Sequence, residues 1–371
     1  MRDLFPELRR WYAEGERFAV ATVIDTFRSA PRQPGAAMAV SGSGEVVGSV
    51  SGGCVEAAVY ELAREAIESG LPMRQRYGVT DDDAFAIGLT CGGVLDLLVQ
   101  PVDRASFPEF AEIDEAVRAE APVAVATLAT PGPDLGRRLI VWPDRVSGSL
   151  GGARLDAAVV DGAVGMLEQG ATALCHFGAQ GERRGADLSV FVQAFAPPPR
   201  MIVFGAIDFA AAVARIGKFL GYHVTVCDAR PVFATRRRFP EADDIVVAWP
   251  HRFLTDAIAD GRIDRRTVLC VLTHDPKFDV PLLELALRTE CGYIGAMGSR
   301  VTHEDRMARL RELGLSEVEL ARLSSPIGLD LGARTPEETA ISIASEIIAS
   351  RGSGSGRPLS STAGRIHSQA A

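Results

Sequence analysis

The stretch GSVSGGCVEAAV, residues 48–59, occurs a second time as GSLGGARLDAAV, residues 148–159. The likeness extends upstream, because FAVATVID at 18–25 is echoed by VAVATLAT at 123–130. Each copy passes from alternating apolar residues, typical of strands, through a glycine turn into an alanine-rich helical pattern. An internal repeat of this kind predicts two copies of one structural unit.

The elements of the first copy can be placed from its periodicity. Apolar alternation predicts strands and 3.6-residue spacing predicts one helix, with strands at 18–27, 36–40, 45–50 and 94–102 and the helix at 55–69. We therefore predict that residues 1–195 form a duplicated β-rich α/β unit, with copies at about 18–102 and 123–195.

A different pattern follows the proline-rich segment APPPR at 196–200. MIVFG is typical of a strand, the next segment of an amphipathic helix, and HVTVCDAR of a second strand that ends near Asp228. Such βαβ alternation with a terminal acid predicts a Rossmann-like domain with a mostly parallel sheet. We place this domain at 200–350 and a mobile Gly/Ser-rich tail at 351–371.

The dinucleotide-binding fingerprint of that domain is altered. Where G-x-G-x-x-G is expected, the chain has Gly205, Ala206, Ile207 and Asp208. Ile207 replaces the glycine that allows close approach of a pyrophosphate, and Asp208 brings negative charge to the helix start. The pattern therefore predicts the Rossmann fold and weak binding of NAD(P).

Composition excludes several classes of protein. The formal charge of −9 and pI of about 5.3 argue against a nucleic-acid partner, which requires a basic surface. The sequence has no apolar run long enough for a membrane span, and its charged start is unlike a signal peptide. Its six cysteines lack the spacing of zinc ligands. We expect a cytoplasmic protein without a metal of its own.

The repeat singles out Cys54, which follows Gly52 and Gly53 at a turn before the predicted helix. The second copy has Arg154 at this position, and it also lacks the segment that contains Cys91. The ordinary interpretation of Cys54 is a small hydrophobic packing residue. The arginine at the equivalent position of the second copy does not fit a packing role and favours a functional thiol. Unpaired amides at the helix start would favour a reactive thiolate or hold a phosphate.

Further candidate residues follow predicted strands of the second domain. His274 and Asp275 come after a buried strand and should reach the edge where such sheets bind ligands, although a loop histidine is equally often a plain surface residue. Ser299 and Arg300 precede a helix that we expect Thr302 to cap. This start is typical of an anion site.

Several motifs together resemble the xanthine dehydrogenase accessory (XdhC/CoxI) family: SAPRQPGA, GSVSGGCVE, TCGG, VTVCDARPVFA, VLTHDPKFD, YIGAMGSR and PIGLDLGARTPEE. They occur in order between about residues 18 and 350. The resemblance implies site residues in both domains, namely Cys54, Cys91, Gly205, His274, Ser299 and Arg300. We add Arg32 from the first motif, Gly52, Gly53, Asp228 and Asp275 as expected cofactor-binding residues.

The resemblance also implies a function. Members bind the molybdenum cofactor, a molybdopterin with or without an attached nucleotide, protect its sulfurated form and pass it to xanthine or CO dehydrogenase apoenzymes. A cysteine desulfurase is an expected partner, and we hypothesise a homodimer. We thus expect an accessory protein more than a free-standing enzyme. The alternatives are an NAD(P)-dependent oxidoreductase and a purely structural assembly partner.

Overall fold

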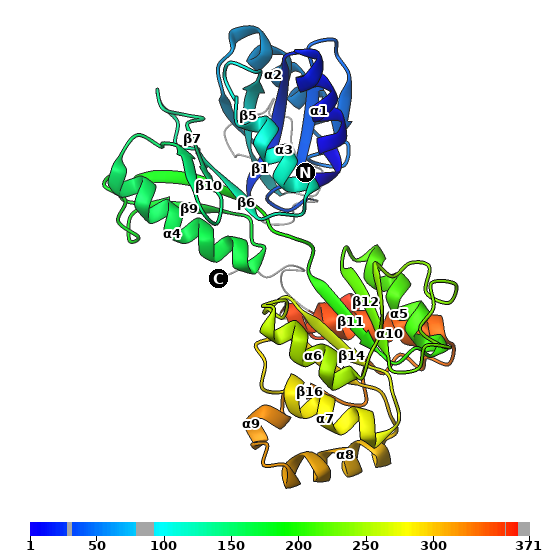
Figure 1. The fold of residues 1–371 in the computed structure, drawn as a ribbon. Helices are drawn as coiled ribbons and strands as arrows, with labels where there is room; N and C mark the ends of the chain where they lie inside the picture. Colours follow the sequence, from blue (N-terminus) through cyan, green and yellow to red (C-terminus); the bar gives the residue numbers. More distant parts are fainter. Residues whose placement is uncertain (28–31, 79–92, 353, 363–371) are drawn as a thin grey trace. The chain divides into compact units, whose positions relative to one another are not determined.

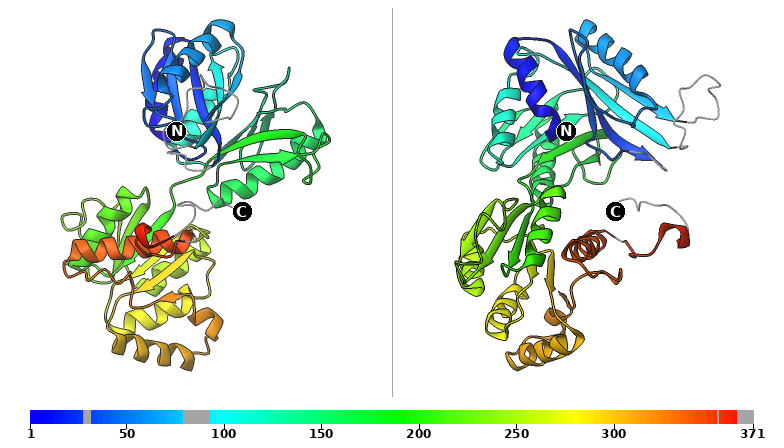
Figure 2. Two further views of the ribbon diagram at one scale, coloured as in Figure 1. Left: turned by 180° about the vertical axis from the view of Figure 1, so that it is seen from behind. Right: turned by 90° about the vertical axis from the view of Figure 1, so that its right-hand side faces the viewer.

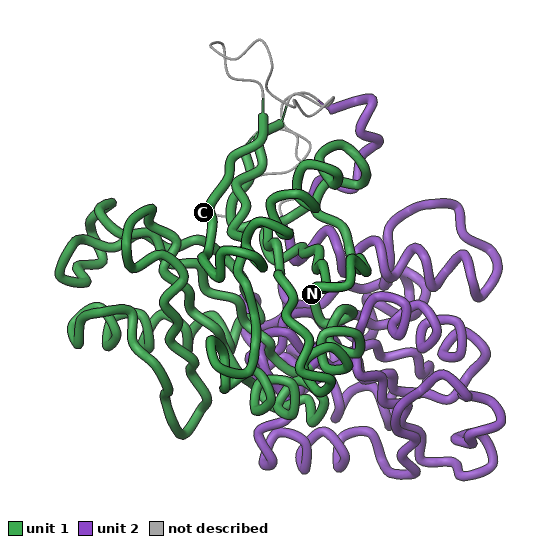
Figure 3. Tube along the Cα trace, turned by 90° about the horizontal axis from the view of Figure 1, so that it is seen from above, with its two compact units in different colours: residues 1–197, 365–371 green, residues 198–364 purple. Residues whose placement is uncertain are grey.

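The computed structural model describes residues 1–27, 32–78, 93–352 and 354–362. The chain divides into two compact units (Figure 3), unit 1 over residues 1–197 and unit 2 over residues 198–364. Each unit has its own hydrophobic core. In the described residues, no helix combines the length and the apolar character needed to cross a membrane.

The first half of unit 1 is an antiparallel five-stranded sheet covered by one helix (Figure 1). Its elements are β1 (Phe18–Phe27), β2 (Ala37–Ser41), β3 (Val46–Gly48), α2 (Glu56–Ser69), β4 (Met73–Gly78) and β5 (Val94–Val102), in the sheet order β3-β2-β1-β5-β4. Val59, Ala63 and Ala66 recur at helical spacing, so α2 buries one apolar stripe against the sheet.

The second half of unit 1 repeats this architecture element by element. It comprises β6 (Val123–Leu128), β7 (Arg138–Val141), β8 (Val146–Gly148), α4 (Ala153–Gln169), β9 (Ala173–Phe177) and β10 (Leu188–Phe195), in the order β8-β7-β6-β10-β9. Each strand pairing of the first sheet has its counterpart in the second. The predicted duplication is confirmed.

Two helices that the sequence analysis did not predict complete unit 1. These are α1 (Phe5–Glu14), preceded by the short 3-10 helix η1 (Arg2–Leu4), and α3 (Phe110–Arg118). Their aromatic residues join Phe18 of the first sheet and Phe195 of the second in one core, with ring centroids of Phe5 and Phe195 5.4 Å apart. This core holds the two copies together.

The copies also contact each other reciprocally through two left-handed glycines. A Cβ atom added to Gly35 (φ +92°) would lie 3.2 Å from Thr172 of the second copy. A Cβ atom added to the equivalent Gly136 (φ +84°) would lie 2.7 Å from Pro72 of the first copy. The left-handed conformation favours glycine at both positions, and at Gly136 the contact with Pro72 also leaves no space for a side chain.

Unit 2 is a parallel six-stranded sheet in the order β13-β12-β11-β14-β15-β16, which is the Rossmann order. Its strands are β11 (Arg200–Phe204), β12 (His223–Asp228), β13 (Asp244–Val247), β14 (Val268–Val271), β15 (Tyr293–Ala296) and β16 (Leu323–Ser324). The predicted fold class is thereby confirmed for the second half of the chain.

Helices of unit 2 cover both faces of the sheet. They are α5 (Asp208–Phe219), α6 (Pro250–Ala259), α7 (Pro276–Ala286), α8 (Arg300–Glu312), α9 (Glu317–Leu320) and α10 (Pro336–Arg351), and an exposed 3-10 helix, η2 (Leu359–Ser361), follows them. Figures 1 and 2 show α10, in red-orange, running beside α5. The capping box of Thr335 and Glu338 starts α10.

The glycine contact between the copies generates a stability prediction. Gly136→Ala should destabilise unit 1 by about 2–4 kcal/mol, because the left-handed backbone and the clash with Pro72 both cost free energy. The matched control is Gly132→Ala, where φ is also positive (+148°) but an added Cβ meets no atom within 4 Å. Chemical unfolding monitored by circular dichroism measures the difference, and equal losses for the two variants would contradict the prediction.

Candidate functional site

The loop before α2 is organised around the carboxylate of Glu56. Its oxygens accept hydrogen bonds from the Ser49 hydroxyl at 2.7 Å and from the backbone N–H groups of Ser51, Gly52 and Gly53 at 2.9, 2.9 and 2.8 Å. Burial raises the pKa of this carboxyl, but the hydrogen bonds from Ser51 and Ser49 outweigh it and lower the pKa to about 2. Glu56 is therefore an ionised anchor of the loop.

Cys54 lies in this loop and outside the helix. The helix begins at Glu56, one residue after the predicted start at residue 55. It does not extend back through Cys54 because Gly53 has a φ of +117°, which is incompatible with a helical turn. In the second copy Ala153 stands at this position and is the first residue of α4, which places Arg154 inside the helix. The loop that presents Cys54 is thus specific to the first copy.

The surroundings of the loop are open on one side. A Cβ atom at Gly52 or Gly53 would meet no atom of the described structure within 4 Å. Their amides, however, donate to Glu56, so an anion would have to compete with that carboxylate for them. Cys54 is half-buried against the core beneath α2. The predicted site residue Cys91 lies outside the described residues.

The other described cysteines have a packing role. Burial raises the pKa of the Cys227 and Cys270 thiols to about 12, and it also raises the pKa of Cys175 and Cys291. Raised values keep these thiols protonated and poorly nucleophilic near neutral pH. Cys54 differs from them in its position in a glycine-rich loop.

The predicted residues of unit 2 gather at the carboxyl edge of its sheet, where β11, β12, β14 and β15 end: Gly205, Asp228, His274, Asp275, Ser299 and Arg300. Buried Asp228 accepts hydrogen bonds from the Ala206 N–H at 2.7 Å and from the Arg230 guanidinium at 2.8 and 2.9 Å. Burial raises the pKa of Asp228, but these contacts lower it overall. The carboxylate is therefore already occupied by protein groups.

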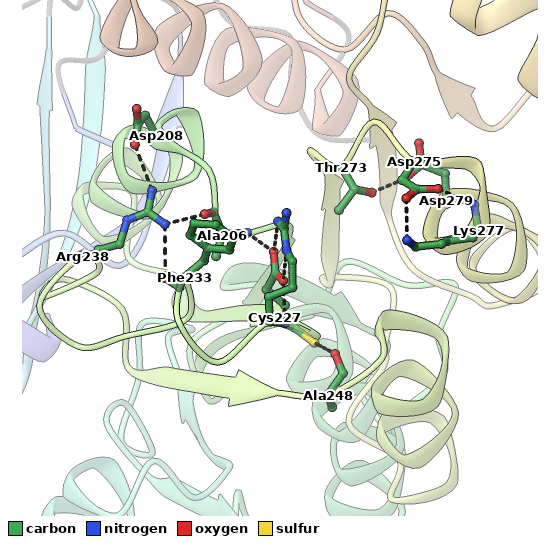
Figure 4. Close-up of polar contacts among 12 residues, drawn as sticks. Ala206, Asp208, Cys227, Phe233, Arg238, Ala248, Thr273, Asp275, Lys277 and Asp279 are labelled. Carbon is green, nitrogen blue, oxygen red and sulfur yellow. Dashed lines mark hydrogen bonds and ion pairs between the residues drawn. The ribbon is translucent and has the colours of Figure 1, made fainter.

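The turn between β11 and α5 is tied down in the same way (Figure 4). Arg238 donates to the Ala206 carbonyl at 2.9 Å and to the Asp208 carboxylate at 2.9 Å. Gly205 has φ +105°, and a Cβ added there would lie 2.8 Å from Thr273. Gly205 is thus explained by close packing of two strand ends, and its turn is closed by a salt bridge.

Two of the predicted residues cap helices. Asp275 caps α7 by accepting the N–H two residues further on at 3.1 Å, and Ser299 caps α8 by accepting the Thr302 N–H at 3.1 Å. The expectation that Thr302 would be the cap was wrong, because α8 begins three residues earlier than a Thr302 cap would allow. His274 and Arg300 are exposed at this edge.

A buried ion pair beneath this edge was not predicted from sequence. Asp279 of α7 accepts from the Thr273 hydroxyl and from Arg306 of α8 at 3.0 Å, and Arg306 also donates to the Met297 carbonyl at 2.9 Å. Burial raises the pKa of Asp279 in spite of Arg306. The pair fixes the segments after β14 and β15, and its partners come from separate helices without a local motif to signal them.

The remaining predicted residue of unit 1, Arg32, is exposed in the segment between β1 and β2, where its charge acts on Asp3. Within the described ranges, no group of three or more His, Cys, Asp or Glu side chains is arranged to hold a metal ion. Of the predicted site residues, Gly52, Gly53 and Cys54 share one loop of unit 1, and those of unit 2 lie at one edge of its sheet.

Models of two related protein domains match this chain. The one described as the XdhC Rossmann domain matches residues 201–347, which hold the parallel sheet. The one described as the XdhC and CoxI family matches residues 11–78 and 116–178, one segment in each copy of the repeat. The chain belongs to the XdhC and CoxI family. The resemblance found in the motifs is confirmed.

Two curated proteins are similar over most of their length. One, called molybdenum cofactor insertion chaperone PaoD, from Escherichia coli (strain K12), is 27% identical over 91% of this chain and 84% of its own. The other, described as a probable xanthine dehydrogenase subunit, from Bacillus subtilis (strain 168), is 26% identical over 91% and 94%. A crystal structure described as a xanthine dehydrogenase from Bacillus halodurans shares the fold, with TM-score 0.69, 24% identity and 97% coverage of both chains.

The Glu56 anchor predicts a pH-dependent loss of stability. Its folded pKa of about 2 lies below the ordinary value of 4.5, so its ionised form stabilises the protein above pH 4.5 and loses this effect as the pH falls toward 2. Glu56→Gln should therefore cost about 1 kcal/mol at pH 7 and progressively less below pH 4.5. Urea unfolding between pH 3 and pH 7 measures this, with the exposed Glu61→Gln of the same helix as control. A cost that stays constant across the range would disprove the role of the charge.

The closed edge of unit 2 predicts weak binding of nicotinamide dinucleotides. Asp228 is paired with Arg230, and Asp208 with Arg238. The carboxylates nearest the expected ribose and pyrophosphate positions are therefore already engaged in salt bridges. Calorimetric titration of the whole protein with NADH and NADPH should give dissociation constants weaker than about 100 µM. Micromolar affinity for either cofactor would contradict this expectation and favour an oxidoreductase.

Proposed function

We propose that this protein binds the molybdenum cofactor as cargo and inserts it into an apoenzyme of the xanthine dehydrogenase type. Its similarity to a protein named a molybdenum cofactor insertion chaperone, over 91% of this chain, supports the proposal. Membership of the XdhC and CoxI family supports the class of client. Under this proposal the protein acts as an accessory factor.

The observation that carries the proposal is the loop built around Cys54. The two copies of the repeat share their sheet and helix, but the first copy starts its helix only at Glu56 and holds Cys54 in a glycine-rich loop. A soft thiolate is a suitable ligand for a molybdenum centre with sulfur ligands. The open space beside Gly52 and Gly53 gives such a cargo access to the loop.

The strand edge of unit 2 supplies charges suited to the phosphate of a pterin cofactor. Arg300 is exposed at the first position of α8, and His274 is exposed after β14. A guanidinium beside a helix start attracts phosphate through both its charge and the helix dipole. We assign these two residues to the phosphate group of the cargo.

Finer features of the proposal follow from the family resemblance. We propose that the protein protects the cofactor and assists its sulfuration, with a cysteine desulfurase as sulfur donor and Cys54 together with Cys91 as the thiols involved. CO dehydrogenase-type apoenzymes are further proposed clients. We also propose that the protein is a cytoplasmic homodimer and accepts a pterin with or without a nucleotide.

An NAD(P)-dependent oxidoreductase is the second candidate, because the strand order of unit 2 is that of dinucleotide-binding domains. The occupied carboxylates of Asp228 and Asp208 weigh against it. The titration with NADH and NADPH decides between these two candidates independently of any cofactor delivery.

The proposal predicts a separation of folding from cargo binding. Cys54→Ser should leave the melting temperature nearly unchanged, because serine is close in size and the Cys54 N–H bond to the Ser51 hydroxyl is made by the backbone. The variant should bind molybdenum cofactor about tenfold or more weakly under anaerobic conditions, since a direct ligand is lost. Absorbance and metal analysis of the purified complex measure binding, and reconstitution of a xanthine dehydrogenase apoenzyme measures delivery.

The matched control is Cys175→Ser, which removes a half-buried thiol from β9 of the second copy. It should retain cargo and delivery, whereas Cys91→Ser should behave like Cys54→Ser if the two thiols act together. Full delivery by Cys54→Ser would return Cys54 to a packing role. Wild-type protein that binds no cofactor at all would reject the proposed function as a whole.

A further inference from the structure

The two copies of unit 1 enclose a cavity of about 60 Å³ between the facing sides of their sheets. Equivalent residues of the two copies line it in pairs, including Thr22 with Thr127, Leu98 with Phe191 and Gln100 with Gln193. The pairs come from the central strands β1, β5, β6 and β10. The cavity therefore lies where the internal symmetry of the repeat brings the copies face to face.

One residue breaks this symmetry. Arg138 of β7 lines the cavity and pairs with Thr127 across the sheet, whereas the first copy has the buried Ala37 paired with Thr22. The same strand pairing forms in the first copy with an alanine at this position. The second copy thus adds a guanidinium to a chamber whose construction does not require one.

The Glu109 carboxylate acts on the Arg138 guanidinium only from beyond salt-bridge distance. In the described part of the chain, no acidic oxygen lies within 4 Å of its guanidinium. Its carbon lies 4.1 Å from the Phe107 ring centroid, Nη1 donates to the Ser106 carbonyl at 3.3 Å, and Nε and Nη2 donate to the side-chain carbonyl of Gln100 at 3.2 and 3.1 Å. Burial lowers the pKa of Arg138 to about 10. A nearby anion would relieve this cost of burying the charge.

Three further polar side chains of the cavity lack partners. Among the residues that the structure describes, the side chains of Thr22, Thr127 and Gln193 make no hydrogen bond. Because these side chains line the cavity and are not engaged by other protein groups, they are available to a ligand that enters it. Together with Arg138 and Gln100, they are the polar residues of a cavity whose other lining residues are apolar.

We propose that this cavity binds a small monocarboxylate, with Arg138 pairing its carboxylate and Thr22, Thr127 and Gln193 contacting a hydroxyl or keto oxygen. One water-sized group occupies about 10–15 Å³ of such volume, so the cavity accommodates about four to six non-hydrogen atoms. Propionate and lactate have this size. The ligand joins the two copies and is independent of the molybdenum cofactor and of Cys54.

Calorimetric titration of the full-length protein with lactate and propionate tests the proposal. We expect one site per chain, and Arg138→Met should weaken binding about tenfold or more because a charge-assisted hydrogen bond is lost. The matched control is Arg137→Met, which removes the same charge from a residue that pairs with Asp134 at 2.9 Å and does not line the cavity. This control should bind like the wild type.

Neutral propionamide and sodium nitrate complete the experiment. Propionamide should bind weakly and nitrate should not compete, because the proposed site needs both the charge and the carbon body. The proposal is overturned if no carboxylate binds at about 20 mM, if Arg138→Met binds like Arg137→Met, or if nitrate displaces lactate. Should Arg138→Met fail to fold, Thr127→Val serves instead, with an expected selective loss of lactate over propionate.

Discussion

The five-stranded sheet of each copy has two apolar faces, but each copy supplies only one helix, which covers one of them. In the first copy α2 covers one face, while Phe18 and Val20 point into the other side of the sheet. That second face is buried by the other copy, with the aromatic residues of α1 and α3 between them. Neither copy could bury its sheet alone, so the duplication is the constraint on which unit 1 depends.

In a duplicated unit each position of one copy can be compared with the equivalent position of the other, which has the same backbone structure. The acid that anchors the loop is common to both, since Asp156 accepts from the Ser149 hydroxyl at 2.7 Å as Glu56 does from Ser49. Differences stand out against this shared frame. A glycine in place of an alanine opens the loop of Cys54, and an arginine in place of an alanine charges the cavity between the sheets.

Local pattern was sufficient for elements whose spacing is regular. The strand predicted at 94–102 has those bounds, and the helix predicted at 55–69 begins one residue later. Helix α1 was not predicted because a short amphipathic helix among many charges gives a weak periodic signal. The cavity was not predicted because its walls come from strands far apart in the sequence. The contact between Arg230 and Asp228 could have been predicted, because the partners are only two positions apart in the sequence.

The two units share one physical feature that bears on cargo release. In each, an internal carboxylate accepts hydrogen bonds from backbone amides of a turn next to a predicted site residue: Glu56 from Gly52 and Gly53, and Asp228 from Ala206. These turns are therefore preorganised without a ligand and offer few open donors to a phosphate. Under the proposed function, the cargo is held by side chains at the surface of each unit. Because delivery requires dissociation, a site without an amide cradle favours transfer to the client over retention.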